Sequence, residues 1–536
     1  MNHTAENDAT AGEDTMDGQA NPVVEDWGPF GRPLFNDPAM KHLTRVGVVD
    51  VGSNSVRLVV FDGAARSPAY FYNEKIMAGL GAGVQETGRL NPEGRVRALA
   101  ALHRFQLLAE TMKLGPLTAV ATAAMREAED GPEFCEQVRR ETGLVLHVIP
   151  GSEEARLSAQ GVLLGWPDAS GMVCDIGGSS MELAELTNGK PGVCVTSPLG
   201  PLRLQAIKGK KARKAHIKAC VAELVEKMGT HQDRLYLVGG SWRAIARLDM
   251  HRRGYPLHVL HEYRMTQKSV RATVDWVATQ DLEVLRQEVG ISEARMVLVP
   301  LAGEVLKVLL RALKPKEIAI SSYGIREGLL YEQMPEELRH RDPLVEACRF
   351  AEDKDARQPG FGRVLYEFLA PLFKSLPTGR RRVVKAACLL HDVSWRAHPD
   401  YRHEVCFDTV TRASLGGLTH TARIFLGLAL LHRYKNSREG TRFEPLYDLL
   451  GEEDILQAEI LGKAMRFASM LAADAPDLMG ELRWFPKKKQ LELHLPPRAM
   501  GLFGEVAQSR FNSLAQSLQA EAIVKKKRAE QKPSLA

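Results

Sequence analysis

Val48-Val49-Asp50-Val51-Gly52-Ser53-Asn54-Ser55-Val56 is repeated in pattern at Val173-Cys174-Asp175-Ile176-Gly177-Gly178-Ser179-Ser180-Met181. Each copy has an apolar run, an Asp, an aliphatic residue, a Gly, two small residues, a Ser and a second apolar run. This pattern predicts a buried strand, a tight turn and a second strand, at 57–62 in one copy and 182–186 in the other. A single copy could be an ordinary hairpin, whereas two copies predict a duplicated scaffold.

The turn of each copy is suited to binding an anion. Small residues allow backbone N–H groups and hydroxyls to approach an anion closely. The Asp residues that end the first strands, Asp50 and Asp175, are placed to hold a metal or a water beside that anion. We therefore expect phosphate contacts from Gly52, Ser53, Asn54 and Ser55 in the first copy and from Gly177, Gly178, Ser179 and Ser180 in the second.

Length and composition indicate a multidomain globular protein. A chain of 536 residues is too long for one core, and 44% hydrophobic and 26% charged residues are typical of soluble domains. No apolar run is long enough to span a bilayer, so we expect no membrane partner. Seven cysteines without a C-x-x-C pair argue against a disulfide framework and a zinc site, which predicts a cytoplasmic location.

The net charge of +5 is unevenly distributed. Residues 1–26 carry seven acids and no Lys or Arg, so the rest of the chain has a net charge of +12. We predict a disordered acidic leader over 1–40. Basic residues cluster at 208–214, 380–382, 487–489 and 525–528. Each cluster alone is typical of a solvated surface, but together they favour a polyanionic ligand, whether nucleic acid or polyphosphate.

Strand and helix signals divide the chain into segments. Helical spacing at 91–113 and 131–142 alternates with strand signals at 117–122 and 144–149, which predicts α/β layers. We predict a first lobe over 41–168 and a second over 169–335, closed by a strand at 317–322. Helical patterns then dominate a third domain over 336–520, apart from a predicted hairpin at 482–485 and 491–495. A basic tail is expected over 521–536.

Three further motifs follow predicted strands. In Gly151-Ser152-Glu153-Glu154, Ser152 could cap a helix and the acids could favour its dipole, but the position is the rim where α/β folds bind ligands. Arg126 could clamp a phosphate through its guanidinium or simply open a surface helix. Gly239-Gly240-Ser241 joins a strand to a helix and is a further candidate backbone cradle for phosphate.

The ordered motifs V-V-D-V-G-S-N-S, A-T-A-A-M-R, G-S-E-E-A-R-L, D-I-G-G-S-S-M-E-L, L-V-G-G-S and Y-G-I-R-E-G-L-L-Y resemble the exopolyphosphatase / guanosine pentaphosphate phosphatase (Ppx/GppA) family over about 45–332. The resemblance implies a duplicated actin-like, hexokinase-like (ribonuclease H-like) ATPase fold with its active site between the lobes. It implies Glu154 as the base that orients or deprotonates water, and a homodimer. Asp50, Asp175 and Glu182 are the expected Mg²⁺ ligands. Many relatives have a third glycine where this chain has Ser179.

The third domain contains an apolar run that ends in His391-Asp392. This pair resembles the adjacent metal ligands of HD phosphohydrolases. No His occurs over 341–390, however, so the upstream metal ligand of that motif is missing. We interpret the segment as a degenerate HD-like domain with a structural or polyphosphate-binding role.

The leading hypothesis is an Mg²⁺-dependent exopolyphosphatase that processively removes terminal phosphate from inorganic polyphosphate. Three features favour this hypothesis over 5′-phosphohydrolysis of guanosine pentaphosphate (pppGpp): the long third domain, the basic clusters, and bulky Trp242 beside Gly239-Gly240-Ser241. One enzyme could also do both. A sugar kinase-like ATPase would need an Asp facing an acceptor hydroxyl, whereas Glu153-Glu154 favours water. A non-catalytic polyanion-binding protein is disfavoured because both Asp-x-Gly turns and Glu154 are present.

Overall fold

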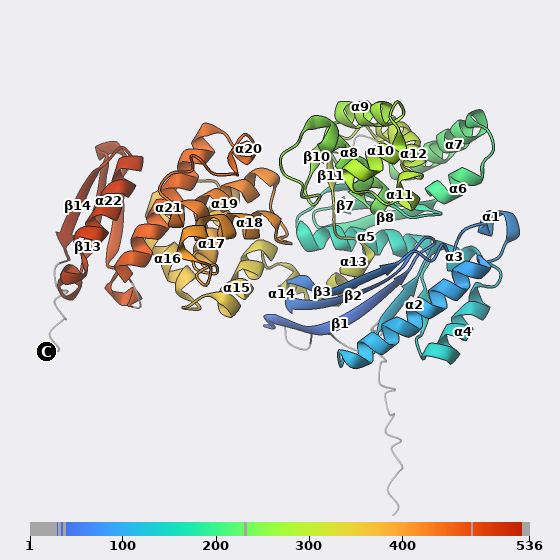
Figure 1. Ribbon diagram of the computed structural model, residues 1–536, viewed down its shortest axis with the longest axis horizontal. Coiled ribbons are helices and arrows are strands. Elements are labelled where there is room, and N and C mark those ends of the chain that lie inside the picture. The colour runs from blue at the N-terminus through green and yellow to red at the C-terminus, as the bar shows by residue number, and fades with distance from the viewer. Residues whose placement is uncertain (1–28, 30–33, 36–38, 230–232, 473–474, 528–536) are drawn as a thin grey trace, which may run out of the picture.

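The computed structural model describes residues 29, 34–35, 39–229, 233–472 and 475–527. Two lobes, each built on one sheet, lie against each other at one end of the elongated molecule (Figure 1). The helical region follows, and a small third sheet lies at the opposite end. In the described part of the chain, no helix combines the length and the apolar character needed to cross a bilayer.

The first lobe contains a five-stranded sheet in the order β3-β2-β1-β4-β5. β1, β2 and β3 form antiparallel pairs, and β4 and β5 run parallel to β1. Phe105 of α2 and Phe134 of α4 pack with Leu58 of β2 in a core on one face of this sheet. The elements are β1 (His42–Val51), β2 (Val56–Ala64), β3 (Ser67–Ile76), α1 (Val84–Thr87), α2 (Pro92–Thr111), β4 (Thr118–Ala121), α3 (Ala123–Glu127), α4 (Gly131–Thr142) and β5 (Leu146–Val148).

The second lobe repeats this topology. Its sheet has the order β10-β11-β9-β6-β7-β8, in which β8-β7-β6-β9-β11 matches β3-β2-β1-β4-β5 in order and direction. The predicted duplication is therefore confirmed. The elements are β6 (Gly171–Ile176), β7 (Met181–Thr187), β8 (Lys190–Ser197), α6 (Pro201–Ala206), α7 (Lys210–Met228), β9 (Arg234–Val238), α8 (Gly240–Arg253), β10 (Arg264–Met265), α9 (Gln267–Val277), α10 (Leu282–Val289), α11 (Glu293–Met296), α12 (Val299–Leu313) and β11 (Glu317–Ile320).

Two helices, α5 (Gly151–Gly165) and α13 (Ile325–Gln333), pack together in the core that joins the two sheets. They approach so closely that a Cβ on Gly328 would lie 1.8 Å from the carbonyl oxygen of Leu157. α5 also packs against β6, β7 and β8. The helix that sequence order assigns to the first lobe therefore covers the sheet of the second.

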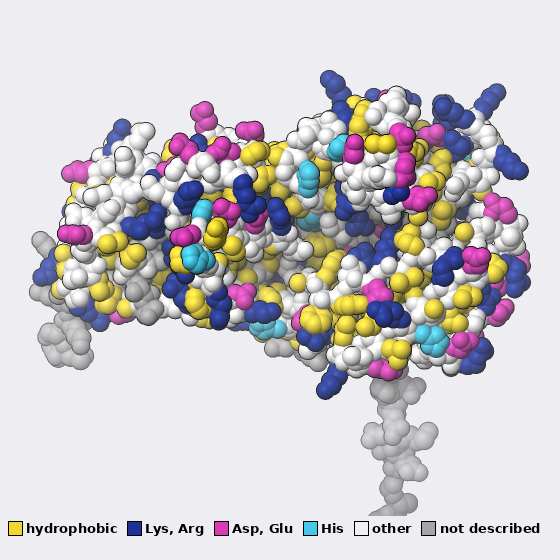
Figure 2. Space-filling view, viewed as in Figure 1, with side chains coloured by type: hydrophobic (Ala, Val, Ile, Leu, Met, Phe, Trp, Pro, Cys, Tyr) yellow, Lys and Arg dark blue, Asp and Glu magenta, His cyan; other side chains and the backbone are white. Residues whose placement is uncertain are grey.

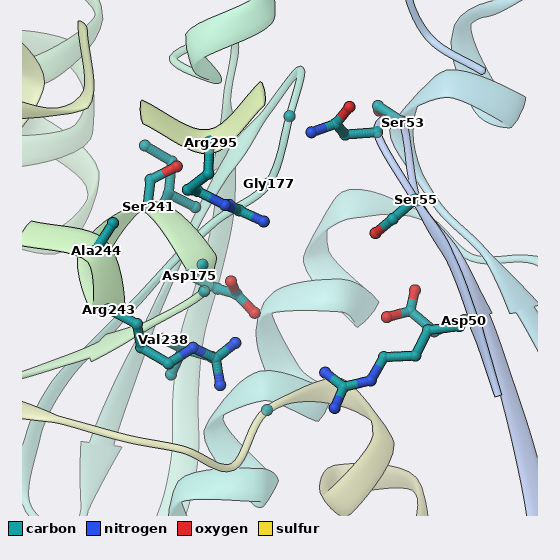
Figure 3. Close-up of a pocket in the computed structure, with 18 of the residues that line it drawn as sticks. Asp50, Ser53, Ser55, Asp175, Gly177, Val238, Ser241, Arg243, Ala244 and Arg295 are labelled. Atoms are coloured by element: carbon teal, nitrogen blue, oxygen red, sulfur yellow. The ribbon is translucent and has the colours of Figure 1, made fainter. Parts of the chain in front are cut away.

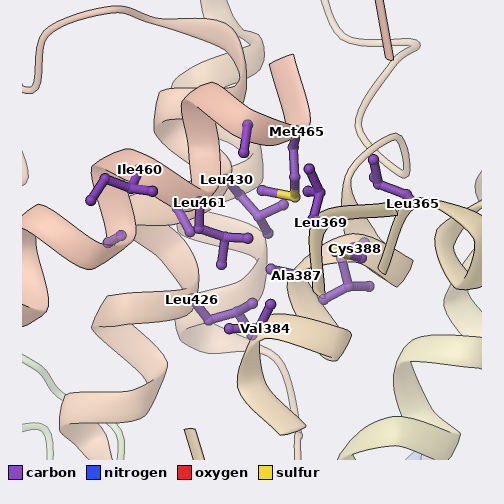
Figure 4. Packing of buried hydrophobic residues seen from close by; sticks show 14 of the residues in the cluster. Leu365, Leu369, Val384, Ala387, Cys388, Leu426, Leu430, Ile460, Leu461 and Met465 are labelled. Carbon is purple, nitrogen blue, oxygen red and sulfur yellow. The ribbon is translucent and has the colours of Figure 1, made fainter. Parts of the chain in front are cut away.

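The remaining helices build the third core, where α16, α17, α19 and α21 meet (Figure 4). Leu369, Val384, Leu430 and Met465 are buried there. These helices are α15 (Pro343–Asp355), α16 (Phe361–Leu369), α17 (Thr378–Leu390), α18 (Arg402–Arg412), α19 (His420–Tyr434), α20 (Glu444–Tyr447) and α21 (Glu452–Ala472), whereas Leu338 of the preceding α14 (Glu336–Arg339) packs in the core that joins the two lobes.

The third sheet confirms one prediction and corrects another. β12 (Glu481–Phe485) and β13 (Gln490–Leu495) form the predicted antiparallel hairpin. β14 (Glu521–Lys526), which follows α22 (Glu505–Ser517), pairs parallel with β13. The predicted basic tail is therefore wrong over 521–526, because these residues complete a sheet, and 528–536 lie outside the described residues.

The predicted acidic leader lies mostly outside the described residues, but its boundary at residue 40 is wrong. Leu34 and Phe35 are each 7% exposed and pack in the core with Leu43 and Val46 of β1. Apolar side chains so near the first strand gain more from burial than from exposure.

Candidate active site

A cavity of about 480 Å³ lies between the two lobes and is lined by both copies of the repeated motif (Figure 3). Asp50 and Ser55 face it from the first lobe, and Asp175 and Ser241 from the second. The predicted residues that the structure brings to this wall are Asp50, Gly52, Ser53, Asn54, Ser55, Glu154, Asp175, Gly177, Gly178, Ser180, Gly239, Gly240 and Ser241.

The two repeated turns are closed by the same hydrogen bond. The N–H of Gly52 donates to the carbonyl oxygen of Ser55, and the N–H of Gly177 to that of Ser180, both at 3.0 Å. A Cβ on Gly178 would lie 3.1 Å from the Cβ of Ser53, so the turns almost touch across the cavity. Ser53 Oγ is buried and, among the described residues, has no hydrogen-bond partner. The hydroxyl is therefore available to a ligand.

The third turn depends on a glycine. Gly239 has a φ of 106°, which L side chains rarely adopt, and a Cβ there would lie 2.6 Å from the carbonyl oxygen of Ile176. The same Cβ would lie 2.9 Å from Oδ1 of Asp175. This turn therefore packs directly against the strand end that carries Asp175.

Glu154 lies in the first turn of α5, directly after β5. The helix begins at Gly151 with Pro150 at the cap position, so the prediction of Ser152 as the N-cap is wrong. Glu154 is only 5% exposed, and its Oε2 lies 3.5 Å from Nη1 of Arg126. Burial raises the pKa of Glu154 well above its usual range, and the negative charges of Glu182 and Asp175 raise it further.

Asp50 and Asp175 fit a magnesium ion bound partly by substrate. Asp50 pairs with Arg326 Nη1 at 3.2 Å, and Ser158 Oγ donates to Asp175 at 2.5 Å. In the described part of the chain, no three His, Cys, Asp or Glu side chains converge as a metal site. Magnesium often binds through one or two carboxylates together with phosphates and waters, and two carboxylates facing one cavity suit that arrangement.

Glu182 lies behind this wall rather than in it. It is opposite Asp175 in the β6–β7 register, is 1% exposed, and accepts a 3.0 Å hydrogen bond from Thr196 Oγ1. Burial raises its pKa to about 8. The structure therefore places Glu182 as a neighbour that acts on the charge of Glu154 and does not bring it to the cavity as a metal ligand.

The cavity wall is strongly basic. Arg57 and Lys75 come from the first lobe, whereas Arg243 and Arg295 extend into the cavity from the second (Figure 3). Burial, with Arg295 and Arg57 as neighbours, lowers the pKa of Lys75 to about 8. Such mutual repulsion between neighbouring cations is relieved by a bound anion. The basic residues of the wall are Arg57, Lys75, Arg243, Arg247, Arg295 and Arg326.

Comparison with known proteins identifies the chain. The sequence pattern of the Ppx/GppA phosphatase family matches residues 59–337, and that of the exopolyphosphatase C-terminal region matches residues 376–523. The chain belongs to the Ppx/GppA phosphatase family. It is therefore an enzyme of the hydrolase class, as the repeated turns and Glu154 predict.

Individual relatives of this Ppx/GppA chain are distant. Retrograde regulation protein 2 of Saccharomyces cerevisiae is 25% identical over 439 residues, which cover 72% of each chain. Exopolyphosphatase 1 of Mycobacterium tuberculosis is 26% identical over 310 residues, covering 55% of this chain and 89% of the relative. The crystal structure of an exopolyphosphatase from Cytophaga hutchinsonii superposes with a TM-score of 0.50 at 21% identity, over 54% of this chain and 98% of that one. This superposition supports the predicted actin-like fold.

Sequence reasoning about this Ppx/GppA chain missed the six basic residues of the wall. Arg57 could have been found, because it directly follows the first turn and lies opposite Asp50 in the β1–β2 register. Arg326 lies in the Y-G-I-R-E-G motif that carries the resemblance. The others are isolated basic residues on separate elements, and no local pattern marks them.

Two predicted phosphate ligands do not line the cavity. Arg126 donates from Nη1 to the carbonyl oxygen of Ile149 at 2.7 Å and lies beside Glu154, and it is absent from the cavity wall. Ser179 is 6% exposed and is absent from the wall. Trp242 is completely buried in the core of the second lobe and does not face the cavity.

The His391-Asp392 pair of the helical region makes contacts within the protein. The guanidinium of Arg357 donates two hydrogen bonds of 2.7 Å to the carboxylate of Asp392. His391 Nδ1 donates to the carbonyl oxygen of Cys388 at 2.8 Å. These contacts accord with a structural role for the pair, and the HD-like assignment of this region stays a prediction.

Proposed function

We propose that the protein is an Mg²⁺-dependent exopolyphosphatase that removes terminal phosphate from inorganic polyphosphate. The observation that carries this proposal is the wall of six basic side chains around one buried glutamate, Glu154. A chain of phosphates offers each cation an oxygen, whereas a neutral substrate would leave them repelling one another. The relatives named exopolyphosphatase support the same substrate.

Glu154 would act as the general base. Hydrolysis of a phosphoanhydride needs a positioned water, a group that accepts its proton, and positive charge around the transferred phosphoryl group. The raised pKa brings the basicity of Glu154 closer to neutral pH, which strengthens it as a proton acceptor. The N–H groups and hydroxyls of the two repeated turns, with Arg243 and Arg326, would bind the phosphate oxygens.

Asp50 and Asp175 would hold Mg²⁺ together with substrate oxygens and waters. When bound, the ion would supply positive charge to the phosphates beside the basic side chains.

Homodimerisation and a cytoplasmic location are further proposals. Light scattering of the purified protein tests whether it is a dimer.

Arg295 supports polyphosphate over a nucleotide substrate. A Cβ on Gly240 would lie 2.3 Å from Nη1 of Arg295, so the guanidinium covers the third turn. Burial lowers the pKa of this Arg. A half-buried cation over this turn suits a further phosphate better than an uncharged ribose or base.

The test measures phosphate release from long-chain polyphosphate, guanosine pentaphosphate and ATP, each with and without Mg²⁺. We expect Mg²⁺-dependent release from polyphosphate, reduced by about 10²–10⁴-fold in Glu154→Gln because the base is lost. Glu153→Gln is the matched control, since Glu153 lies in the same helical turn, bonds to Arg156 and is outside the cavity wall. Full activity of Glu154→Gln, or release from guanosine pentaphosphate alone, would overturn the proposal.

A further inference from the structure

A second basic cavity, of about 600 Å³, lies in the helical region at the end of α17. Its only carboxylate among the described wall residues is Asp392, which Arg357 already binds through two hydrogen bonds. The wall otherwise contains four arginines from four separate elements: Arg402, Arg433, Arg466 and Arg510. The positive charge of this cavity therefore exceeds its negative charge several-fold.

Three of these arginines lack an ionic partner. Among the described residues, no carboxylate lies within ion-pair distance of Arg433, Arg466 or Arg510. The Nε atoms of Arg433 and Arg510 are buried without a hydrogen-bond partner in the described structure. Burial and the positive charges of Arg510 and Arg433 together lower the pKa of Arg466 to about 10. Half-buried cations without a compensating charge, two of them with a buried Nε that makes no hydrogen bond to any described residue, are stabilised when an anion binds them.

The remaining wall is shaped for a compact ligand. Phe361, Tyr434 and Met470 supply ring and thioether surface beside the arginines, and Gln358 and Ser469 supply polar groups. The volume falls within the range of small-molecule sites, about 300–1,000 Å³. Burial lowers the pKa of His391 to about 4, so this side chain is uncharged at neutral pH and can contact a ligand as a neutral ring.

We propose that this cavity is a second anion site, which binds the di- or triphosphate group of a compact ligand. Arg433, Arg466 and Arg510 would bind the phosphates through their guanidinium groups, as arginine does in many phosphate sites. Arg466 and Arg510 also line an adjoining cavity of about 870 Å³ that includes Lys463, which leaves room for the rest of the ligand. None of these residues belongs to the cavity between the lobes, so the proposal does not rest on the exopolyphosphatase activity.

The test is calorimetric titration of the full chain with tripolyphosphate and with ATP. Glu154→Gln serves as the parent protein so that no ligand is hydrolysed. For at least one of the two ligands we expect two binding events, one per cavity. The change Arg466→Gln with Arg510→Gln should weaken one event by at least about tenfold, because two charge-assisted contacts are lost. Arg412→Gln, an exposed Arg paired with Asp408, is the control and should leave both events unchanged.

The two ligands distinguish the sources of the phosphate group. Tighter binding of ATP than of tripolyphosphate at the second site identifies a nucleotide, whereas equal binding identifies recognition of the phosphates alone. No binding of either ligand to the parent, or binding events that the double variant leaves unchanged for both ligands, would overturn the proposal.

A folding control keeps this test interpretable. If the double variant unfolds at a lower temperature than the parent, Arg466→Lys replaces it, because this change keeps the charge and removes the planar fork. We then expect severalfold weaker binding at the second site with an unchanged unfolding midpoint. Independently, tripolyphosphate should slow amide hydrogen exchange in α22 of the parent, and unchanged exchange there would contradict the proposed site.

Discussion

The neighbours of Glu154 determine its chemistry. The side chain lies at the start of a helix, where an acid is ordinarily stabilised in its charged form. Here burial and the carboxylates of Glu182 and Asp175 outweigh that effect and raise the pKa. The group is therefore a better proton acceptor than an exposed glutamate, provided the pH is high enough to ionise it.

Replacing Glu182 should change the pH dependence of catalysis. With Glu154 as the proposed general base, its deprotonated form is the active one, and kcat/KM should fall as the pH drops through its pKa. Glu182, with a pKa of about 8, is ionised only as the pH approaches and passes that value, and there Glu182→Gln removes a negative charge that raises the pKa of Glu154, while Gln can still accept the hydrogen bond of Thr196. The acidic limb of the kcat/KM profile should therefore move to lower pH. Glu185→Gln, on the same strand, is the control, and an unmoved acidic limb in Glu182→Gln would contradict this account.

The site residues that could be predicted from sequence are those whose role depends on local structure. Asp50 and Gly177 belong to short strand-turn-strand segments, whose structure is determined by the residues of the segment itself. Lys75 and Arg295 could not be predicted, because their positions depend on how two lobes are packed. Arg126 shows the converse, since a local motif predicts a phosphate ligand whereas its contacts in the structure are to Ile149 and Glu154.

At the scale of elements, the contact between α5 and α13 matters most for the proposed function. α5 carries Glu154 in its first turn, and α13 carries Arg326, which pairs with Asp50. Their backbones meet at Gly328, which no larger residue can replace without moving one helix. The crossing therefore fixes Glu154 relative to Asp50 on the first strand.

Gly328→Ala should destabilise the protein and slow catalysis without touching substrate. The added Cβ would lie 1.8 Å from the Leu157 carbonyl oxygen, so the helices must separate, at a cost of about 1–3 kcal/mol or more. Thermal unfolding and kcat measure the two effects. Gly379→Ala, in α17 with open space around the added Cβ, should instead stabilise by about 0.5–1 kcal/mol. Equal unfolding midpoints for the two variants would show that the crossing tolerates a side chain.

One strand, β14, could not be predicted from the sequence because its lysines indicate a solvated tail. The lysines at the end of the chain indicated a solvated tail, yet Lys525 lies in β14 and its Nζ donates to Glu492 of β13 at 2.6 Å. The neighbouring strand supplies the compensating charge, and that pairing is invisible until the register is known. Strands with clear apolar runs, such as β1 and β6, were predictable because burial of both faces leaves a continuous signal.

For the molecule as a whole, the distribution of positive charge matters more for binding the proposed substrate than the net charge does. Figure 2 shows Lys and Arg side chains both on the outer surface and in the hollow between the lobes. The 208–214 cluster does not reach that hollow, because Lys210 and Lys214 line a different cavity of the second lobe. The clusters seen in the sequence therefore differ from the basic residues that surround Glu154.

The pH dependence of KM, measured with and without the Lys75 side chain, tests whether the two lobes act together on the substrate. It belongs to the first lobe, but Arg295 and Arg243 of the second contribute to lowering its pKa to about 8. A lysine with a lowered pKa loses its charge as the pH rises through that value, so the KM for tripolyphosphate should rise above pH 8. Lys75→Gln should raise KM about tenfold at pH 7 and abolish this rise, because a charged contact to phosphate is lost.

Lys210→Gln is the matched control, since it removes one positive charge from the second lobe outside the cavity. We expect its KM and its pH profile to equal those of the parent. Arg295→Gln supplies the other half of the argument. Among the charged neighbours of Lys75, Arg295 lowers its pKa most. Its removal should therefore raise the pKa of Lys75 and move the rise in KM to higher pH. A rise that stays at the same pH in Arg295→Gln would mean that the lobes do not share one electrostatic field in solution.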